Sequence, residues 1–201
     1  MRQASPALAV FIERMVLGMI FSPVRFTLKD GRSAILRSPD PMADAADLVQ
    51  YLCDTAADTP FVLRTPEEIR YTVEGEERFL QNVVDSPDDC MILCEVDGYI
   101  AGNCHLSFNR RIKTRHACSV AIALRKAYWG NGIGTAMFAD MEGLARQREG
   151  VRPITLEFIE GNARARGLYE KMGFRIVGMH PDFIRQEDGT MCALYIMQKK
   201  L

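Results

Sequence analysis

The feature that most constrains this chain is a glycine-rich turn between an apolar run and a helical pattern. The apolar run covers residues 120–124, the turn covers residues 128–135 with glycine at 130, 132 and 134, and a helix is predicted to start near Ala136. The first N–H groups of a helix lack partners inside it and attract anions, and glycine lets a ligand approach the backbone without meeting a Cβ. The segment therefore predicts a strand, a turn and a helix that bind a phosphorylated ligand.

Two common phosphate-binding motifs do not match this turn. A Walker A loop ends in Gly-Lys-Ser/Thr, but Lys126 precedes the glycines. A dinucleotide-binding fingerprint needs a third glycine three positions after the second, where this chain has Thr135 or Met137. A nucleoside triphosphate and a dinucleotide are therefore both disfavoured as ligands.

The remaining pattern resembles the pyrophosphate-binding turn of the GNAT superfamily of acyl-CoA-dependent N-acetyltransferases, Arg/Gln-x-x-Gly-x-Gly/Ala. Gly132 and Gly134 occupy the glycine positions, and Trp129 stands where the family usually has Arg or Gln. A second segment resembles the family pattern Asn-x-x-Ala-x-x-Leu-Tyr-x-x-x-Gly-Phe. It is matched at Asn162, Ala165, Leu168, Tyr169, Gly173 and Phe174. Two motifs in the family's order make the resemblance specific.

The resemblance implies acetyl-CoA as co-substrate and a primary amine, of a small molecule or of a protein or peptide, that attacks the thioester directly. The backbone of Ile122, Ala123 and Leu124 would pair with the pantetheine arm, and one of its N–H groups would hold the thioester oxygen. Asn162 would anchor the pantetheine or orient the helix that carries Tyr169. The N–H groups expected to bind the pyrophosphate are those of Trp129, Gly130, Asn131, Gly132, Ile133, Gly134 and Thr135.

Tyr169 is the predicted general acid. A phenol with a pKa of about 10 protonates a thiolate, whose thiol has a pKa of about 8.5, only with help from hydrogen bonding or amine deprotonation, so a modest contribution is expected. Relatives often carry a glutamate on the strand before the turn, whereas residues 117–119 of this chain include no carboxylate. Glu157 on the next predicted strand is the predicted base, and His116 is an alternative.

The missing strand carboxylate leaves a second class of function open. It is a non-catalytic acyl-CoA-binding sensor or assembly module that has kept the phosphate-binding turn and lost the base. The basic run at residues 110–115 is interpreted as a solvated turn, with the 3′-phosphate of coenzyme A or an acidic acceptor as its alternative ligands.

The order of apolar periods predicts an α/β fold with a mixed, mainly antiparallel central sheet flanked by helices, which is the acyl-CoA N-acyltransferase fold. Two helices follow an opening hairpin; the first covers residues 44–57 and the second is predicted to start at an N-cap at Thr65 and to be broken or kinked at Gly75. Strands are expected at residues 24–28, 33–37, 91–96, 99–108, 117–124, 154–158, 174–177 and 191–197.

Length and composition favour an ordinary globular protein. The chain has 201 residues, a net charge of −1 and an apolar fraction of 48%, which disfavours two full domains and a nucleic-acid-binding surface. Six cysteines without CxxC spacing predict reduced thiols in a cytoplasmic protein. No metal site is predicted, because His116 and Cys118, expected on one face of a strand, have no second pair of ligands at short spacing.

Residues 1–21 are predicted to form an apolar helical extension to a single GNAT-like domain at residues 22–201. Two charged residues, Glu13 and Arg14, divide the extension into apolar pieces that are too short to cross a bilayer. It also lacks the small-residue cleavage region of a signal peptide. The extension is therefore expected to pack on the domain, or on a second copy in a homodimer, rather than to enter a membrane.

Overall fold

The structure is a computed structural model that describes residues 19–201. Its strands are β1 (Val24–Thr27), β2 (Ser33–Arg37), β3 (Asp89–Val96), β4 (Tyr99–Phe108), β5 (Cys118–Leu124), β6 (Pro153–Ile159), β7 (Arg175–Arg185) and β8 (Met191–Lys200). Its helices are α2 (Pro41–Asp58), α3 (Val73–Asp85), α4 (Ile133–Gln147) and α5 (Ala163–Lys171), with short 3-10 helices η1 (Pro66–Glu68) and η2 (Lys126–Tyr128). The predicted extension at residues 1–21 lies outside the described residues, except for residues 19–21, which carry no helix.

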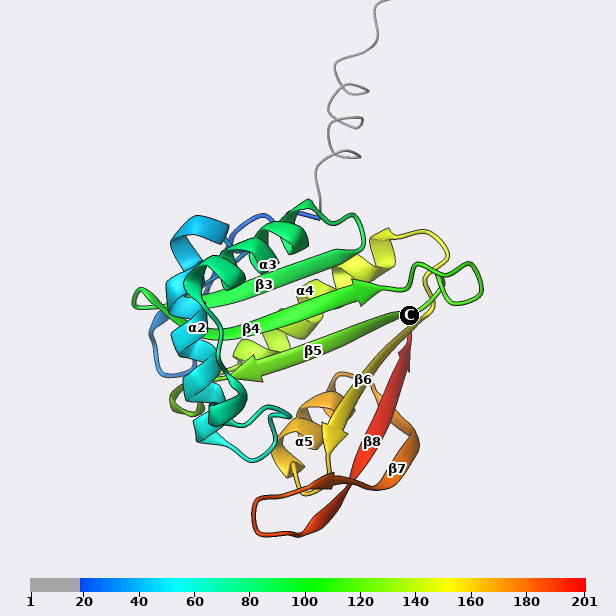
Figure 1. The fold of residues 1–201 in the computed structure, drawn as a ribbon. Coiled ribbons are helices and arrows are strands. Elements are labelled where there is room, and N and C mark those ends of the chain that lie inside the picture. The colour runs from blue at the N-terminus through cyan, green and yellow to red at the C-terminus, as the bar shows by residue number, and fades with distance from the viewer. Residues whose placement is uncertain (1–18) are drawn as a thin grey trace, which may run out of the picture.

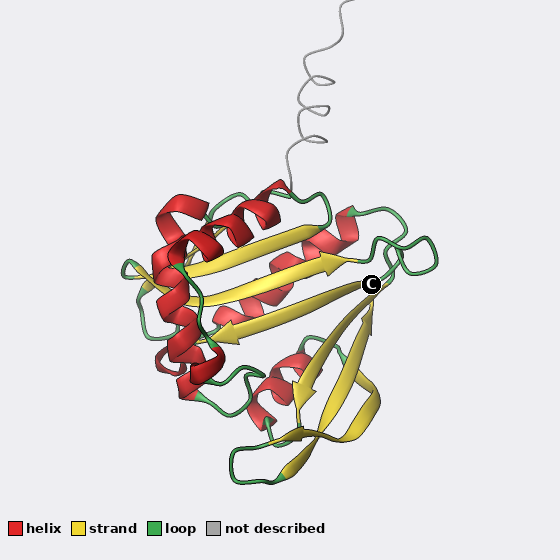
Figure 2. Ribbon diagram, in the orientation of Figure 1, coloured by secondary structure: helices red, strands yellow, loops and turns green. Residues whose placement is uncertain are grey.

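The strands form one eight-stranded sheet in the order β1-β2-β3-β4-β5-β6-β8-β7 (Figures 1 and 2). All neighbouring strands are antiparallel except β5 and β6. In the view of Figure 1, α2 and α3 lie in front of the sheet and α4 lies behind it. The predicted α/β fold with a mainly antiparallel central sheet flanked by helices is confirmed.

Side-chain alternation along the central strands divides the apolar core between the two faces of the sheet. On β3, Ile92 packs in a cluster that includes Met137 of α4, whereas Leu93 packs with Leu48 of α2 and Leu80 of α3. Because successive strand residues point to opposite faces, one apolar run can support helices on both. The strands between these helices are thereby held in place.

Helix α3 begins later than the sequence predicts. The predicted N-cap at Thr65 is wrong as a helix start, because Thr65 and Glu68 form a capping box that is complete within the single turn of η1. The α-helix starts at Val73, where the Thr72 hydroxyl accepts the N–H of Gly75 at 3.1 Å. A capping box needs only one turn, whereas a longer helix also needs an apolar face to bury. Gly75 lies in the first turn and does not break the helix.

Strands β5 and β6 are parallel and pair only at their first residues. The register joins Cys118 to Ile154 and Ser119 to Thr155, after which the two strands diverge, as Figure 1 shows. Beyond this point β5 keeps its antiparallel neighbour β4 on one side and has no described strand on the other. The backbone groups on the open side of β5 therefore need another partner.

A buried tyrosine hydroxyl joins β4 and β5 beside this gap. Tyr51 of α2 donates from Oη to the carbonyl of Ala123 at 2.7 Å and accepts the N–H of Asn103 at 3.2 Å. Tyr51 is fully buried, and burial raises the pKa of its phenol, so the hydroxyl stays protonated and able to donate. Helix α2 is thereby tied to the strand that borders the gap.

We expect Tyr51→Phe to lower the free energy of unfolding by about 1–3 kcal/mol, because it leaves a buried N–H and a buried C=O without a partner. Urea denaturation followed by circular dichroism measures the change. The matched control is Tyr99→Phe, since Tyr99 is 65% exposed. Equal stability of the two variants would contradict the role assigned to the Tyr51 hydroxyl.

Candidate active site

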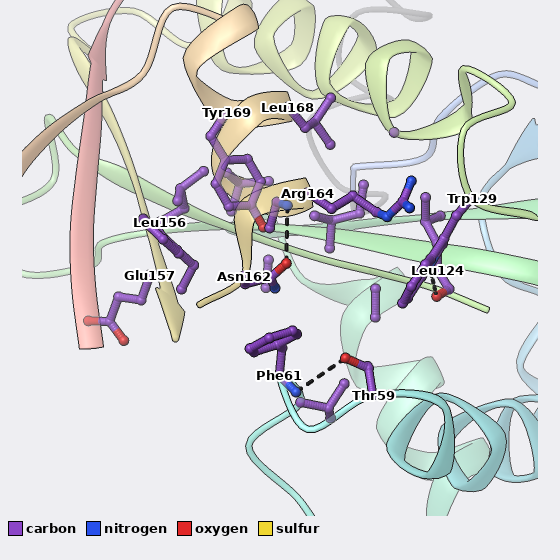
Figure 3. Close-up of a pocket in the computed structure, with 18 of the residues that line it drawn as sticks. Thr59, Phe61, Leu124, Trp129, Leu156, Glu157, Asn162, Arg164, Leu168 and Tyr169 are labelled. Atoms are coloured by element: carbon purple, nitrogen blue, oxygen red, sulfur yellow. Dashed lines mark hydrogen bonds between the residues drawn. The ribbon is translucent and has the colours of Figure 1, made fainter. Parts of the chain in front are cut away.

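The gap between β5 and β6 opens into a cleft of about 1000 Å³. It is bordered by these two strands, by the start of α4, by α5 and by the loop after α2 (Figure 3). All of the residues that the sequence predicts for cofactor binding and catalysis line it except Asn131, whose carbonyl accepts the N–H of Lys29 at 3.4 Å. The volume is at the upper end of the range for small-molecule sites, so the cleft has room for a large ligand.

Helix α4 starts at the cleft without a side-chain cap. It begins at Ile133, earlier than the predicted start near Ala136, and its N-cap is Gly132. The N–H groups of Ile133, Gly134 and Thr135 donate to no described group, and Ala136 is the first to bond, to the Gly132 carbonyl at 3.1 Å. By contrast, a side chain caps each of α2, α3 and α5. Helix α4 therefore presents free donors and the positive end of its dipole to the cleft.

The three glycines of the turn have different roles. Gly130 and Gly132 have φ of +82° and +93°, a region that residues with a Cβ rarely adopt. Gly134 lies inside α4, and a Cβ there would lie 2.8 Å from Cδ2 of Leu168 on α5. The lack of a side chain at Gly134 therefore permits close packing of α4 on α5, in addition to opening the backbone to a ligand.

Trp129 takes the place of the basic or amide residue in the family pattern and contributes differently. Its Nε1 donates to the carbonyl of Leu124 at 2.8 Å, which ties the turn to the end of β5. The guanidinium of Arg164, at the start of α5, lies 4.9 Å from the centre of the Trp129 ring, and Figure 3 shows it extending toward the indole. This cation–π contact holds a positive charge on the wall of the cleft. Arg164 thus supplies a charge that Trp129 lacks.

Backbone groups of β5 face the cleft at alternate residues. The N–H of Arg125 donates to a β4 carbonyl at 3.0 Å, and the carbonyl of Ala123 lies on the same side, where Tyr51 holds it. Because backbone groups alternate between the two edges of a strand, those of Ile122 and Leu124 point into the cleft. This open edge can accept an extended ligand as an added strand.

Tyr169 reaches the cleft from an aromatic cluster. Its ring meets Phe138 and Phe158 edge-on, with centroids 5.5 and 6.1 Å away, and the residue is only 6% exposed. Burial raises the pKa of its phenol, and the hydroxyl bonds to none of the residues that the structure describes. A neutral hydroxyl with a free O–H can donate a hydrogen bond or a proton to an atom bound in the cleft.

Asn162 and Glu157 both line the cleft, but Asn162 is hydrogen-bonded within a helix cap and Glu157 is exposed on a strand. The Asn162 side chain caps α5 by accepting the N–H of Ala165 at 3.1 Å (Figure 3), an arrangement that suits the role of orienting the Tyr169 helix. Glu157 is exposed on β6, and Figure 3 shows its carboxylate pointing away from Tyr169. Asn162 thus stabilises the start of α5, and Glu157 lies on the solvent-exposed side of the cleft.

His116, the alternative base, and the basic run at residues 110–115, an alternative ligand-binding segment, do not line the cleft. His116 belongs to the turn before β5, not to a strand, so the expectation that it shares a strand face with Cys118 is wrong; the turn residues bond to one another before strand pairing begins. The basic run at residues 110–115 lies at the end of β5 remote from the start of α4 and lines no part of the cleft. Its Arg110 pairs with Asp89 at 3.3 Å. The run is therefore a surface turn.

Four of the six cysteines are buried in the core. Cys94, Cys104 and Cys118 are at most 1% exposed, and burial raises the pKa of the Cys118 thiol to about 11. A thiol that is protonated at neutral pH is a poor nucleophile.

Within residues 19–201, no group of three or more His, Cys, Asp or Glu side chains is arranged to hold a metal ion. Nor does any helix of this part of the chain have the length and apolarity to span a bilayer.

The cleft also contains residues that no sequence motif predicts. His105 and Ser107 of β4 line it near Ser119, and Phe61 lines it from the loop after α2. A Cβ on Gly161 would lie 3.6 Å from Cε1 of Phe61, so this loop approaches the turn between β6 and α5. The only signal in the sequence is the placement of polar residues at alternate positions of an apolar strand.

Comparison with known proteins identifies the family. The model of the Acetyltransferase (GNAT) family matches residues 48–174, which is more than half of the chain. The chain therefore belongs to the GNAT acetyltransferase family. No curated protein matches it.

Solved structures share the fold. An acetyltransferase of the GNAT family from Streptococcus pneumoniae superposes with a TM-score of 0.78 at 29% identity, covering 84% of this chain and 99% of that one. A ribosomal-protein-alanine N-acetyltransferase from Brucella melitensis has a TM-score of 0.71 at 23% identity, covering 83% and 99%. The putative acetyltransferase yncA from Salmonella typhimurium, solved with its cofactor acetyl-CoA, has a TM-score of 0.69 at 17% identity, covering 84% and 94%.

We expect Gly132→Val to weaken acetyl-CoA binding at least tenfold. A β-branched residue is strained at a φ of +93°, so the turn must move and carry the N–H groups of α4 away from the ligand. Isothermal titration calorimetry measures the affinity. The matched control is Gly189→Val, because Gly189 has a φ of +87° in the turn between β7 and β8, outside the cleft. Equal affinity of both variants would rule out the α4 start as the phosphate site.

Proposed function

We propose that the chain is an N-acetyltransferase that transfers the acetyl group of acetyl-CoA to a primary amine by direct attack. The observation that carries the proposal is that one cleft contains two sets of backbone N–H groups without a described partner, at the start of α4 and at Ile122 and Leu124 of β5. The first set suits a diphosphate, and the second suits an extended chain with amide groups. Coenzyme A contains both, and membership of the GNAT family supports this assignment.

On the donor side, the diphosphate would bind the N–H groups of the turn and of residues 133–135. Arg164 would add a positive charge there, since its guanidinium is held by the Trp129 ring. The pantetheine arm would pair with the open edge at Ile122 and Leu124, and one of these N–H groups would stabilise the thioester oxygen as negative charge develops on it. Backbone donors serve this purpose whatever side chains β5 carries.

Tyr169 is the proposed general acid. In the reaction the neutral amine nitrogen attacks the thioester carbon, the C–S bond breaks, and the thiolate takes a proton from the phenol. Because burial raises the pKa of Tyr169, the phenol is reliably protonated but is a weak acid. Its proton transfer must therefore be coupled to loss of the proton on the attacking nitrogen, which restores the phenol.

The acceptor would approach over the face of the sheet opposite α4. Thr155 and Glu157 point to that face, since they alternate with Leu156 in the α4-side core. We propose that the exposed Glu157 carboxylate attracts an amine in its ammonium form. Its predicted role as the base stays a prediction, because Figure 3 shows the carboxylate pointing away from Tyr169.

Two further expectations concern the setting of the enzyme. All six cysteines are free thiols, which suits the proposed cytoplasmic location. The predicted homodimer involves the extension at residues 1–21, and sedimentation of the full chain at several concentrations tests it. Neither expectation affects the chemistry proposed for the cleft.

The alternative function, a non-catalytic acyl-CoA-binding sensor or assembly module, is favoured by one observation. Residues 117–119 provide no carboxylate on β5. A thiol-release assay with acetyl-CoA and spermidine, an aminoglycoside, lysine or an alanyl peptide separates the two functions. Thiol release with any of these amines supports the enzyme, whereas tight binding of acetyl-CoA without turnover of any amine would support the module.

We expect Tyr169→Phe to lower kcat by more than tenfold and to change acetyl-CoA affinity by less than twofold. The variant keeps the aromatic packing with Phe138 and Phe158 and removes only the proton donor. Steady-state kinetics and calorimetry measure the two quantities, with the exposed Tyr99→Phe as control. Unchanged kcat would remove Tyr169 from the mechanism.

A further inference from the structure

We propose that His105, positioned by Asp89, is the base that removes the proton from the acceptor ammonium through one bridging water. This inference rests on the proposed acetyltransferase function. It supplies the proton acceptor that β5 lacks, since residues 117–119 provide no carboxylate. The base would then come from the neighbouring strand, β4.

The position of His105 on the sheet places it beside the reacting atoms. The register of β4 and β5 pairs His105 with Ala121, so their Cβ atoms lie about 4.5–5.5 Å apart. Ala121 directly precedes Ile122, whose backbone faces the cleft on the proposed thioester side. A side chain in this position reaches an amine at the thioester with the help of one water molecule.

His105 faces the acceptor side of the sheet. It alternates with Cys104 and Leu106, which lie in the core cluster beneath α4, so its ring points to the opposite face. On that face Ser119 and Ala121 of β5 are exposed, and no described helix covers them. His105 is therefore a half-buried group at the edge of an open surface where an acceptor can bind.

The two ring nitrogens of His105 have different surroundings. Nε2 is buried and lies 3.3 Å from Oδ1 of Asp89, just beyond the usual N–H···O range, so the attraction is mainly electrostatic. Nδ1 bonds to no described residue and, unlike Nε2, is not sealed from the cleft that the ring lines. A carboxylate beside Nε2 favours the tautomer with its proton there. The lone pair of Nδ1 is then available in the cleft.

Asp89 is held in the form that this arrangement needs. Its Oδ1 accepts the Ser107 hydroxyl and its Oδ2 accepts the Ser86 hydroxyl, both at 2.7 Å, and Arg110 lies 3.3 Å away. Burial raises the pKa of Asp89, but these hydrogen bonds and the positive charge of Arg110 oppose it, and the net result is a lowered pKa. Asp89 thus remains a carboxylate at neutral pH and acts as a positioning residue.

The protonation state of His105 suits a base. Burial lowers its pKa below 6.5, although the charge of Asp89 opposes the shift. The imidazole is therefore neutral at pH 7, and its ability to accept a proton is lost as the pH falls through its pKa. Asp89 from β3 is the charged group that faces it directly, with Arg110 behind that carboxylate.

Each proton in the reaction has a defined donor and acceptor. The bridging water gives a proton to Nδ1 and takes one from the acceptor ammonium, which leaves a neutral amine and an imidazolium. The amine forms the C–N bond to the thioester carbon, the C–S bond breaks, and the thiolate takes the phenol proton of Tyr169. In the same step the phenol regains a proton by taking the remaining excess proton of the nitrogen, and the imidazolium later releases its proton to solvent.

The tautomer and pKa of His105 are tested first, without any acceptor. In ¹H–¹⁵N correlation spectra, His105 is expected to carry its neutral-form proton on Nε2 and to titrate below pH 6.5. His105→Gln identifies its signals among those of the three histidines. Asp89→Asn is expected to lower this pKa further and to mix the tautomers, whereas Asp88→Asn, which removes another charge paired with Arg110, is expected to change neither. A proton on Nδ1 in the full-length protein would overturn the proposal.

The pH dependence of the steady-state kinetics then tests the role in catalysis. It is measured at saturating acetyl-CoA with whichever panel amine releases thiol fastest. Wild-type kcat/KM for the amine, which reports the enzyme before the amine binds, is expected to fall in acid with the apparent pKa that the spectra give for His105. In His105→Gln, kcat at pH 7.5 is expected to drop more than tenfold and the acid limb to disappear, whereas Glu157→Gln is expected to keep the limb. The kcat of Asp89→Asn at pH 7.5 is expected to lie between those of the wild type and of His105→Gln.

The outcomes separate this inference from the function on which it rests. Persistence of the acid limb in His105→Gln, or its loss in Glu157→Gln, would overturn the role of His105 while thiol release by the wild type still supports the acetyltransferase. Absence of thiol release with every panel amine would overturn the acetyltransferase and, with it, the need for a base.

Discussion

The divergence of β5 and β6 is the constraint on which the rest of the site depends. Two parallel strands that pair for only two residues at one end leave the cleft-side N–H groups of β5 without a strand partner for the remainder of its length. Unbonded backbone groups are costly unless water or a ligand satisfies them. The sheet therefore contains an interruption that a chain bearing amide groups can fill, and the cleft follows from topology rather than from a particular side chain.

The surrounding packing keeps this interruption open. Helix α4 buries Met137 beneath the sheet, and α2 ties itself to β5 through the Tyr51 hydroxyl, so neither strand can shift to close the gap without loss of core contacts. The same packing brings the uncapped start of α4 to the head of the cleft. The unbonded N–H donors of α4, an open strand edge and the Tyr169 hydroxyl thus meet in one place because the core positions them together.

The sequence predicts the fold class, and it identifies residues of the glycine turn and of α5 that line the cleft, because their signals are local. The glycine turn and the segment from Asn162 to Phe174 each determine their own conformation within a few residues. Features that depend on tertiary contacts have no such local signal: His105 lies one strand away from β5, and Arg164 becomes relevant only when its guanidinium stacks on Trp129. The helix start predicted at Thr65 is wrong for the opposite reason. The capping box at Thr65 is a genuine local signal, but the turn that follows it buries no residue, so the helix does not continue.

Amide hydrogen exchange measured by NMR with and without acetyl-CoA tests the central claim most directly. If acetyl-CoA occupies the donors that the structure leaves unbonded, the N–H groups of Ile133, Gly134 and Thr135, and those of Ile122 and Leu124, will exchange at least tenfold more slowly in its presence. Protection at the start of α4 and along β5 together is the predicted result. Saturating acetyl-CoA that leaves exchange at both segments unchanged would contradict the account.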